Sequence, residues 1–376
     1  MENRILWVSG SFDDNDGKSS GLSRKMYEYL LNRLEIKEIR YINGGNFKKL
    51  TNINFSDYNI IFWFANVSND KPKIVENIKS INQKCLLITS KRNVEKKYDL
   101  REIVQKALKI KSNLIIEFSP KFKDTDSYSN YYLGRVLDPL GNIFLEKTDN
   151  FEQVMITVCN RIKELQNFTR VSSISVKDNN IIDIPNEKEF FNIVEKYGKK
   201  FHNLIHGIGK TNRFLGNASF RCEVGFPSFK QENDKFYIYV SKRNVDKRII
   251  DNNSFVRVNL DDLKETMYHG NYKPSVDTPI QKRLYNYYKG IKYIVHGHIY
   301  IKGAKKTNLV IPCGSLEEFN EIKKLFPDPN QVNFCINLRG HGFVVLSDNL
   351  EYLRNIEKRF IMKNLFEVVK NNKNGI

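Results

Sequence analysis

Three histidines are the residues of this sequence best suited to chemistry. His296 and His298 end the apolar run Tyr293-Ile294-Val295, and His341 stands in the segment Arg339-Gly340-His341-Gly342. Such a run predicts a strand, and alternate residues of a strand point to the same face. Two imidazoles on one face and a third from a neighbouring strand form the ligand set of a catalytic divalent-metal site with an open coordination position. Each histidine alone is typical of a hydrogen-bonded strand end, but the three together favour a metal.

An acidic residue, Asp277, lies upstream of the histidines in Pro274-Ser275-Val276-Asp277-Thr278-Pro279. A carboxylate beside a dication could complete its coordination or move a proton. An Asp before Thr-Pro is also typical of the residue that caps the N-terminus of a helix. The two roles are compatible, and the nearby histidines favour the catalytic one.

A cationic pair, Lys242 and Arg243, follows a strand-like run in Ser241-Lys242-Arg243-Asn244. These side chains could bind an anionic substrate through charge-assisted hydrogen bonds, and a solvated loop is the alternative interpretation. A near copy begins at Ser90, which in a chain rich in Lys and Asn fits coincidence better than a repeat. Tyr300, beyond the histidine strand, is a further acid–base candidate, although most strand tyrosines simply pack.

Residues 1–168 alternate between strand and helix patterns. Strands are expected at 5–8, 38–42, 59–65, 85–89 and 114–118, and helices at 22–34, 74–81, 100–110 and 151–165. This alternation predicts a parallel sheet with helices on both faces, in a Rossmann-like or flavodoxin-like α/β domain. Residues 169–186 are polar and are expected to form a linker to a second domain at 187–376.

The loop after the first strand contains Gly17, Lys18, Ser19 and Ser20, directly before an expected helix. Ligands of parallel sheets bind beyond the carboxyl ends of strands, and small residues at a helix start let backbone N–H groups face an anion. The loop could therefore bind a phosphate or a nucleotide, with a flexible solvated connection as the equal alternative. It matches neither dinucleotide-binding nor P-loop glycine patterns.

The second domain is expected to begin with a helix at 187–207 and to contain helices at 281–288 and 350–369 around the histidine strand. The order of four motifs in this half resembles the class II aldolase/adducin family of metal-dependent aldolases and epimerases. The resemblance implies substrate-phosphate contacts at Gly216, Asn217, Ser219 and Ser275, an acidic catalytic residue at Asp277, and metal ligands, usually for zinc, at His296, His298 and His341.

The resemblance implies an α/β/α domain that cleaves or epimerises a phosphorylated, sugar-like hydroxy-carbonyl compound through a metal-stabilised enediolate. It also implies a homotetramer or another homo-oligomer. The Ser-Val-Asp-Thr-Pro wording is closer to the epimerase branch, while aldol cleavage stands first and decarboxylation is another alternative. The alternative from another functional class is a non-catalytic, adducin-like scaffold, which has no need of a metal triad.

Three departures from the family pattern affect the expected reaction. Val276 replaces a serine that binds phosphate, and the cationic loop Ser241–Asn244 replaces a Thr-Pro-Thr-Gly-like loop. The stretch after His298 is too short for the usual helix that carries a proton-transferring Tyr or Asp. The second acid–base residue therefore cannot be transferred from the family.

Composition limits the cellular context. The chain has 376 residues, of which 40% are hydrophobic and 12% aromatic, enough for two folded domains. The net charge of +18 is spread along the chain, so it favours anionic ligands without requiring nucleic acid. Five scattered cysteines, no signal-like N-terminus and no long apolar run predict a cytoplasmic protein with reduced thiols and no membrane contact.

Overall fold

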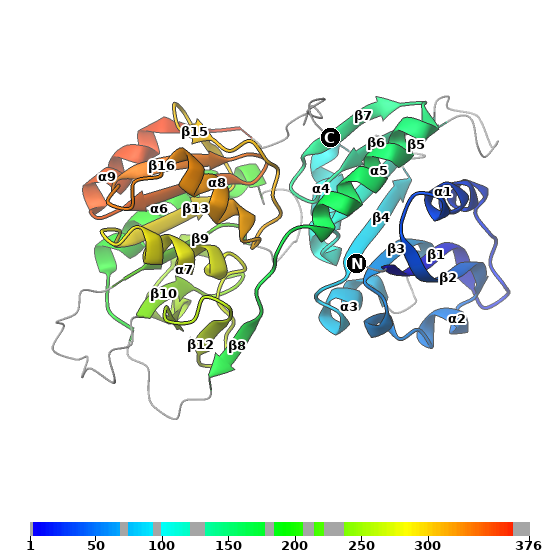
Figure 1. Ribbon diagram of the computed structural model, residues 1–376, viewed down its shortest axis with the longest axis horizontal. Coiled ribbons are helices and arrows are strands. Elements are labelled where there is room, and N and C mark those ends of the chain that lie inside the picture. The colour runs from blue at the N-terminus through cyan, green and yellow to red at the C-terminus, as the bar shows by residue number, and fades with distance from the viewer. Residues whose placement is uncertain are drawn as a thin grey trace. The chain divides into compact units, whose positions relative to one another are not determined.

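The structure is a computed structural model that describes residues 3–67, 74–92, 99–120, 132–176, 184–205, 214–221 and 237–363 (Figure 1). The chain divides into two compact units, the first ending at Asn167 and the second beginning at Phe168. Both units are mixed α/β, as predicted, and each is described by itself.

The first unit contains a seven-stranded sheet with the order β2-β1-β3-β4-β5-β6-β7. Its strands are β1 (Asn3–Asp13), β2 (Ile36–Asn46), β3 (Ile60–Val67), β4 (Leu86–Arg92), β5 (Leu114–Pro120), β6 (Tyr132–Leu137) and β7 (Ile143–Thr148). The first five pair in parallel in the flavodoxin-like order 2-1-3-4-5, which confirms the predicted sheet. The antiparallel pair β6–β7 was not predicted, and it extends the sheet beyond β5.

Helices cover both faces of this sheet. They are α1 (Gly21–Leu31), α2 (Lys48–Thr51), α3 (Ile74–Ile81), α4 (Leu100–Ile110) and α5 (Phe151–Gln166), with the short 3-10 helix η1 (Phe55–Asp57). On one face, Leu6 and Val8 of β1 share a core with Ile78 of α3. On the other, Trp7 donates a hydrogen bond to the Ser23 hydroxyl of α1 at 2.8 Å. Alternate residues of one strand thus serve two cores, as the pleat of a strand requires.

The second unit is built on a nine-stranded sheet with the order β15-β16-β17-β13-β9-β10-β11-β12-β8. Its strands are β8 (Ser173–Val176), β9 (Asn217–Phe220), β10 (Tyr237–Ser241), β11 (Phe255–Asn259), β12 (Thr266–His269), β13 (Tyr293–Gly297), β15 (Lys305–Lys306), β16 (Phe334–Leu338) and β17 (Gly342–Ser347). Within residues 169–186, which were predicted to form a linker, β8 pairs in parallel with β12.

Two layers of helices enclose this sheet and give the expected α/β/α arrangement. The helices are α6 (Lys188–Ile205), α7 (Thr278–Tyr287), α8 (Glu317–Leu325) and α9 (Leu350–Ile356), with the 3-10 turns η2 (Lys247–Ile249), η3 (Asn252–Ser254) and η4 (Glu357–Arg359). Phe190 of α6 and Leu353 of α9 pack in one core with Phe220. Leu284 of α7 and Ile322 of α8 pack in the other core.

The last predicted helix is too long. It ends at Ile356, and after η4 the chain forms β18 (Phe360–Ile361), which pairs with β14 (Tyr300–Ile301) in a separate two-stranded sheet. Phe360 stacks on Phe343 at 5.2 Å and is partly buried against the core, so its ring is placed by this strand and not by another helical turn. Tertiary packing has overridden the helical pattern here.

No helix in the described parts of the chain has the length and apolarity that crossing a membrane requires. Among the described cysteines, Cys85, Cys159 and Cys335 are buried and Cys313 is half-buried, and all four are free thiols. Burial raises the pKa of Cys159 to about 11, so this thiol is protonated and unreactive. Cys222 lies outside the described residues.

Candidate metal centre

The three predicted histidines meet in the interior of the second unit. His296 lies in β13, His298 directly follows that strand, and His341 precedes β17, which pairs with β13. One ring nitrogen from each lies within 4.8 Å of the others, and the side chains are 4%, 5% and 1% exposed in chain order. The antiparallel pairing of β13 and β17 therefore assembles the cluster from segments distant in sequence.

The ring nitrogens of His296 and His341 are arranged as those of metal ligands. Nδ1 of His296 donates to the carbonyl oxygen of Phe343 at 2.7 Å, which leaves Nε2 with the lone pair. Nε2 of His296 and Nε2 of His341 are buried without a hydrogen-bond partner. Burial, followed by the neighbouring His341, lowers the pKa of His296 to about 4, so the imidazole is neutral at physiological pH. Buried lone pairs without partners are unfavourable unless they bind something, and a divalent cation fits these donors.

Glu318, in the first turn of α8, completes the environment of His341. Its carboxylate accepts a hydrogen bond from Nδ1 of His341, and both side chains are almost fully buried. Burial raises the pKa of Glu318 to about 7, against the opposing effect of His341. A carboxylate behind a histidine sets the tautomer and direction of a metal ligand. Sequence reasoning missed Glu318, although the pattern Glu317-Glu318-Phe319 with Ile322 and Leu325 is that of an amphipathic helix start.

Gly342 allows the two histidine segments to lie so close together. Its φ is +129°, and a Cβ there would overlap the carbonyl oxygen of Gly297 and lie 2.8 Å from Cα of His298. A side chain at this position would therefore separate His298 from His341. The glycine next to the third histidine is part of the site's construction.

Asp277 reaches the same site from the start of α7. It occupies the capping position of that helix, but its side chain makes no capping hydrogen bond. Its Oδ2 accepts a hydrogen bond from Nδ2 of Asn217 at 2.6 Å and lies 3.9 Å from Nε2 of His296. Its Oδ1 is buried without a partner. The carboxylate is therefore directed at the histidine cluster instead of the helix terminus.

Asn217 holds this carboxylate and is itself held by α7. Its Oδ1 accepts a hydrogen bond from Nε2 of Gln281, so both ends of the Asn217 amide are in use. The residue was predicted to bind substrate phosphate, and in this structure its amide contacts Asp277 and Gln281. Gln281 was not predicted, since nothing in the sequence shows which face of the helix it occupies.

Three other predicted residues make contacts within the second unit. Ser219 is fully buried, and its hydroxyl lies within hydrogen-bond distance of the Tyr285 hydroxyl at 3.1 Å. The Tyr300 hydroxyl accepts the N–H of Gly340 at 2.8 Å and holds the turn before His341. Gly216, with φ +82°, approaches β13 so closely that a Cβ would lie 2.7 Å from the carbonyl oxygen of His296.

The remaining predicted substrate residues lie on two adjoining loops. The N–H of Ser275 donates to the carbonyl oxygen of Ser241 at 3.0 Å. Nε of Arg243 donates to the carbonyl oxygen of Pro274 at 3.3 Å, and the Lys242 ammonium lies 4.3 Å from the centre of the Tyr272 ring. The structure thus brings Lys242 and Arg243 to the loop that carries Ser275 and leads to Asp277.

The predicted phosphate loop of the first unit uses its donors internally. The backbone N–H groups of Gly17, Lys18 and Ser20 all donate within the unit, the last to the Asn43 side chain at 2.9 Å. The Ser20 hydroxyl caps α1, and the Ser19 hydroxyl donates to the carbonyl oxygen of Asn43 at 2.6 Å. These groups are not available to an anion in this conformation.

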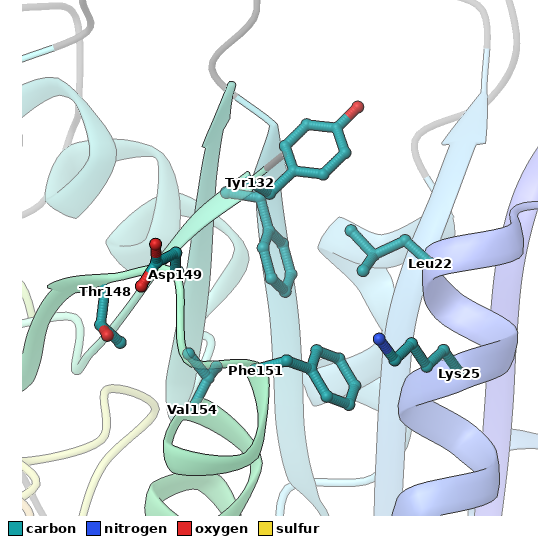
Figure 2. A pocket seen from close by; sticks show the side chains of 9 residues that line it. Leu22, Lys25, Tyr132, Thr148, Asp149, Phe151 and Val154 are labelled. Atoms are coloured by element: carbon teal, nitrogen blue, oxygen red, sulfur yellow. The ribbon is translucent and has the colours of Figure 1, made fainter. Parts of the chain in front are cut away.

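The first unit does contain a pocket of about 260 Å³ at the starts of α1 and α5 (Figure 2). It is lined by Leu22, Lys25, Phe118, Tyr132, Gly134, Thr148, Asp149, Phe151 and Val154. Figure 2 shows Lys25 reaching in from α1, with Thr148 and Asp149 on the opposite side. The Lys25 ammonium lies 4.6 Å from the centre of the Phe151 ring.

Residues 200–301 match the family model of the Class II Aldolase and Adducin N-terminal domain, which confirms the predicted resemblance for this part of the chain. Comparison with curated protein sequences gave no match.

Several solved structures are similar to one half of the chain each. L-fuculose 1-phosphate aldolase is 16% identical over 46% of this chain and 82% of that chain, with a TM-score of 0.31. The N-terminal class II aldolase domain of a conserved protein from Thermoplasma acidophilum is 16% identical over 48% and 96%, with a TM-score of 0.32. The DNA/pantothenate metabolism flavoprotein from Streptococcus pneumoniae is 16% identical over 43% and 99%, with a TM-score of 0.32.

Proposed function

We propose that the second unit is a divalent-metal-dependent lyase or epimerase that acts on a phosphorylated, sugar-like hydroxy-carbonyl compound. The observation that carries the proposal is the buried cluster of three imidazoles, two of which present Nε2 atoms without partners. Three nitrogen donors with an open position suit a catalytic zinc ion better than a structural one.

The chain's own residues supply the other parts of such a reaction. A bound divalent cation would act as a Lewis acid toward the substrate carbonyl and hydroxyl oxygens. Asp277, with one buried and unpartnered carboxylate oxygen, would take the proton from the carbon or hydroxyl beside the carbonyl. Lys242 and Arg243 would hold the phosphate through charge-assisted hydrogen bonds. The enclosed histidine cluster keeps bulk water away from the carbanionic enediolate of the substrate.

A scaffold role is the alternative, and the site argues against it. A binding protein without chemistry has no use for a cluster of buried imidazoles beside a directed carboxylate, because each is unfavourable for folding. We also propose a homo-oligomer. The exposed Ile249 and Tyr272, at 74% and 64%, would be partly covered in such an assembly.

The proposal is tested by metal content and hydrogen exchange. The purified protein is expected to contain close to one divalent metal per chain and to exchange the carbon-bound hydrogens of dihydroxyacetone phosphate in D₂O, followed by NMR. Removal of the metal with a chelator should stop the exchange. The Asp277→Asn variant should retain the metal and exchange about 100-fold more slowly, the usual contribution of an acid–base group. A stably folded protein that takes up no divalent metal, even when supplied with zinc, would contradict the proposal.

For the first unit we propose a nucleotide ligand, supported by the pocket of Figure 2. The base of the nucleotide would pack on the Phe118 and Phe151 rings. The phosphate of the nucleotide would contact Lys25, which has no carboxylate partner among the described residues. The volume of about 260 Å³ favours a mononucleotide over a dinucleotide.

Lys25→Met is expected to weaken AMP binding to the intact protein about tenfold, because a charge-assisted contact is lost. Isothermal titration calorimetry measures this, with Lys84→Met, an exposed lysine outside the pocket, as the matched control. Adenosine, which has no phosphate, should bind wild type and Lys25→Met equally. Equal AMP affinity in wild type and Lys25→Met would exclude this pocket.

A further inference from the structure

Lys247 is a buried lysine beside the candidate metal centre that has no role in the chemistry described so far. It begins η2 and is only 9% exposed. Helix α6 packs tightly on it, since a Cβ on Gly198 would lie 2.8 Å from the backbone of Lys247. The Lys247 main chain is thus fixed, and its side chain has to run inward.

The adjacent acid does not neutralise this lysine by a direct contact. Both oxygens of Asp246 accept hydrogen bonds from the Arg248 guanidinium, at 2.6–3.1 Å. The ammonium of Lys247 donates instead to the backbone carbonyl of Phe214 at 3.1 Å. Burial lowers the pKa of Lys247 to about 8, while Asp246 and Asp277 act in the opposite direction. At neutral pH the group is therefore still a cation, and Asp277 is within its electrostatic reach.

The Phe214 peptide connects Lys247 to the site. Its carbonyl accepts from Lys247, and its N–H donates to the Asn244 side chain at 2.8 Å. Two residues later Gly216 lies against the carbonyl of His296, and the next residue, Asn217, holds Asp277. The turn that carries the Asp277 partner is thus held in place by two side chains, one of which is charged.

We propose that Lys247 is a positioning residue of the candidate active site, which fixes the Phe214–Gly216 turn and thereby the direction in which Asn217 presents the Asp277 carboxylate. A lysine is unfavourable for folding in this place, and a methionine of similar length would fill it without burying a charge. Its presence is explained by the site, where it also places a positive charge beside Asp277. This inference rests on the proposed function, because it assigns Asp277 a direction that matters.

The test compares Lys247→Met with Lys247→Arg in the intact protein. In Lys247→Met the denaturation midpoint at pH 7 is expected to rise, because the folded protein no longer buries an ammonium. A group whose pKa is lowered on folding opposes stability below that pKa, so the gain should shrink between pH 8 and pH 10 as the wild-type lysine loses its proton. The charged groups that act on Lys247 are Asp246 and Asp277. A lysine with a merely structural role would give the opposite result, a fall in the midpoint at pH 7.

Two further measurements address positioning directly. The exchange of dihydroxyacetone phosphate hydrogens should slow at least about tenfold in Lys247→Met and recover in part in Lys247→Arg, while zinc affinity stays within about threefold of wild type. The visible absorption spectrum of the Co²⁺-substituted protein should change in Lys247→Met as it does in Asp277→Asn.

An unchanged Co²⁺ spectrum in Lys247→Met, or a lower midpoint with loss of metal, would overturn the proposal. Absence of hydrogen exchange in the wild-type protein would instead count against the proposed reaction. The Co²⁺ spectrum and the denaturation midpoint would still decide the role of Lys247 in that case.

Discussion

Replacement of His296 by alanine is expected to lower the affinity of the protein for a divalent metal by a factor of about 100 or more. Four-ligand protein sites bind zinc with roughly 10–16 kcal/mol, so one ligand accounts for about 3 kcal/mol. Nε2 of His296 is preorganised, because its Nδ1 is held by the Phe343 carbonyl and the ring is buried. Competition titration with a zinc chelator measures the change.

Two controls give this result its meaning. His269 is also buried, 8% exposed, but belongs to β12 outside the cluster, so His269→Ala should keep wild-type affinity. Glu318→Gln should lower the metal affinity about 10–100-fold, since it leaves His341 in place and removes only the carboxylate behind it. Equal metal affinity in His296→Ala and wild type would exclude the histidine cluster as the metal-binding site.

Gly342→Ala is expected to reduce the free energy of unfolding of the second unit by about 3 kcal/mol and to impair metal binding as well. The positive φ of +129° strains any residue with a Cβ, and that Cβ would meet the backbone of Gly297 and His298. Strands β13 and β17 would have to separate where they carry His298 and His341. Circular dichroism during urea denaturation, with and without zinc, measures the loss of stability.

The chain offers matched controls for this substitution too. Gly21→Ala adds a Cβ at the first residue of α1, where nothing lies within 4 Å, and should leave stability close to wild type. Both tryptophans, Trp7 and Trp63, belong to the first unit, so their fluorescence follows that unit alone. A transition that moves in circular dichroism but not in fluorescence would place the damage in the second unit. An unshifted circular dichroism transition in Gly342→Ala would contradict the prediction.

The sequence allowed the histidine cluster to be predicted because three scarce histidines occur in strand and turn contexts that converge. The helix patterns at 74–81 and 100–110 coincide with α3 and α4, since both carry clear apolar faces that the sheet buries. Local patterns of this kind are decided by neighbours in sequence, and they could be read without the fold.

Other parts of the site depend on partners that are distant in sequence. The contacts of Asn217 could not be predicted, because Gln281 and Asp277, which bond to the two ends of its amide, are distant from it in sequence. Glu318 acquires its role only because α8 places it behind His341. The β6–β7 pair was missed because the alternation of strands and helices predicted a purely parallel sheet. Antiparallel strands are joined without a crossover helix, so this alternation does not reveal them.

The positions of His298 and His341 affect the local unfolding of the segment between them. His298 and His341 bracket the segment that contains β14, β15, α8 and β16, and Glu318 fastens the middle of that segment to the same point. An ion bound by both histidines would close the segment into a loop and reduce the number of conformations that it can reach when it detaches. Amide protons of α8 would then exchange with solvent more slowly in the metal-loaded protein, and proteases would cleave this segment last.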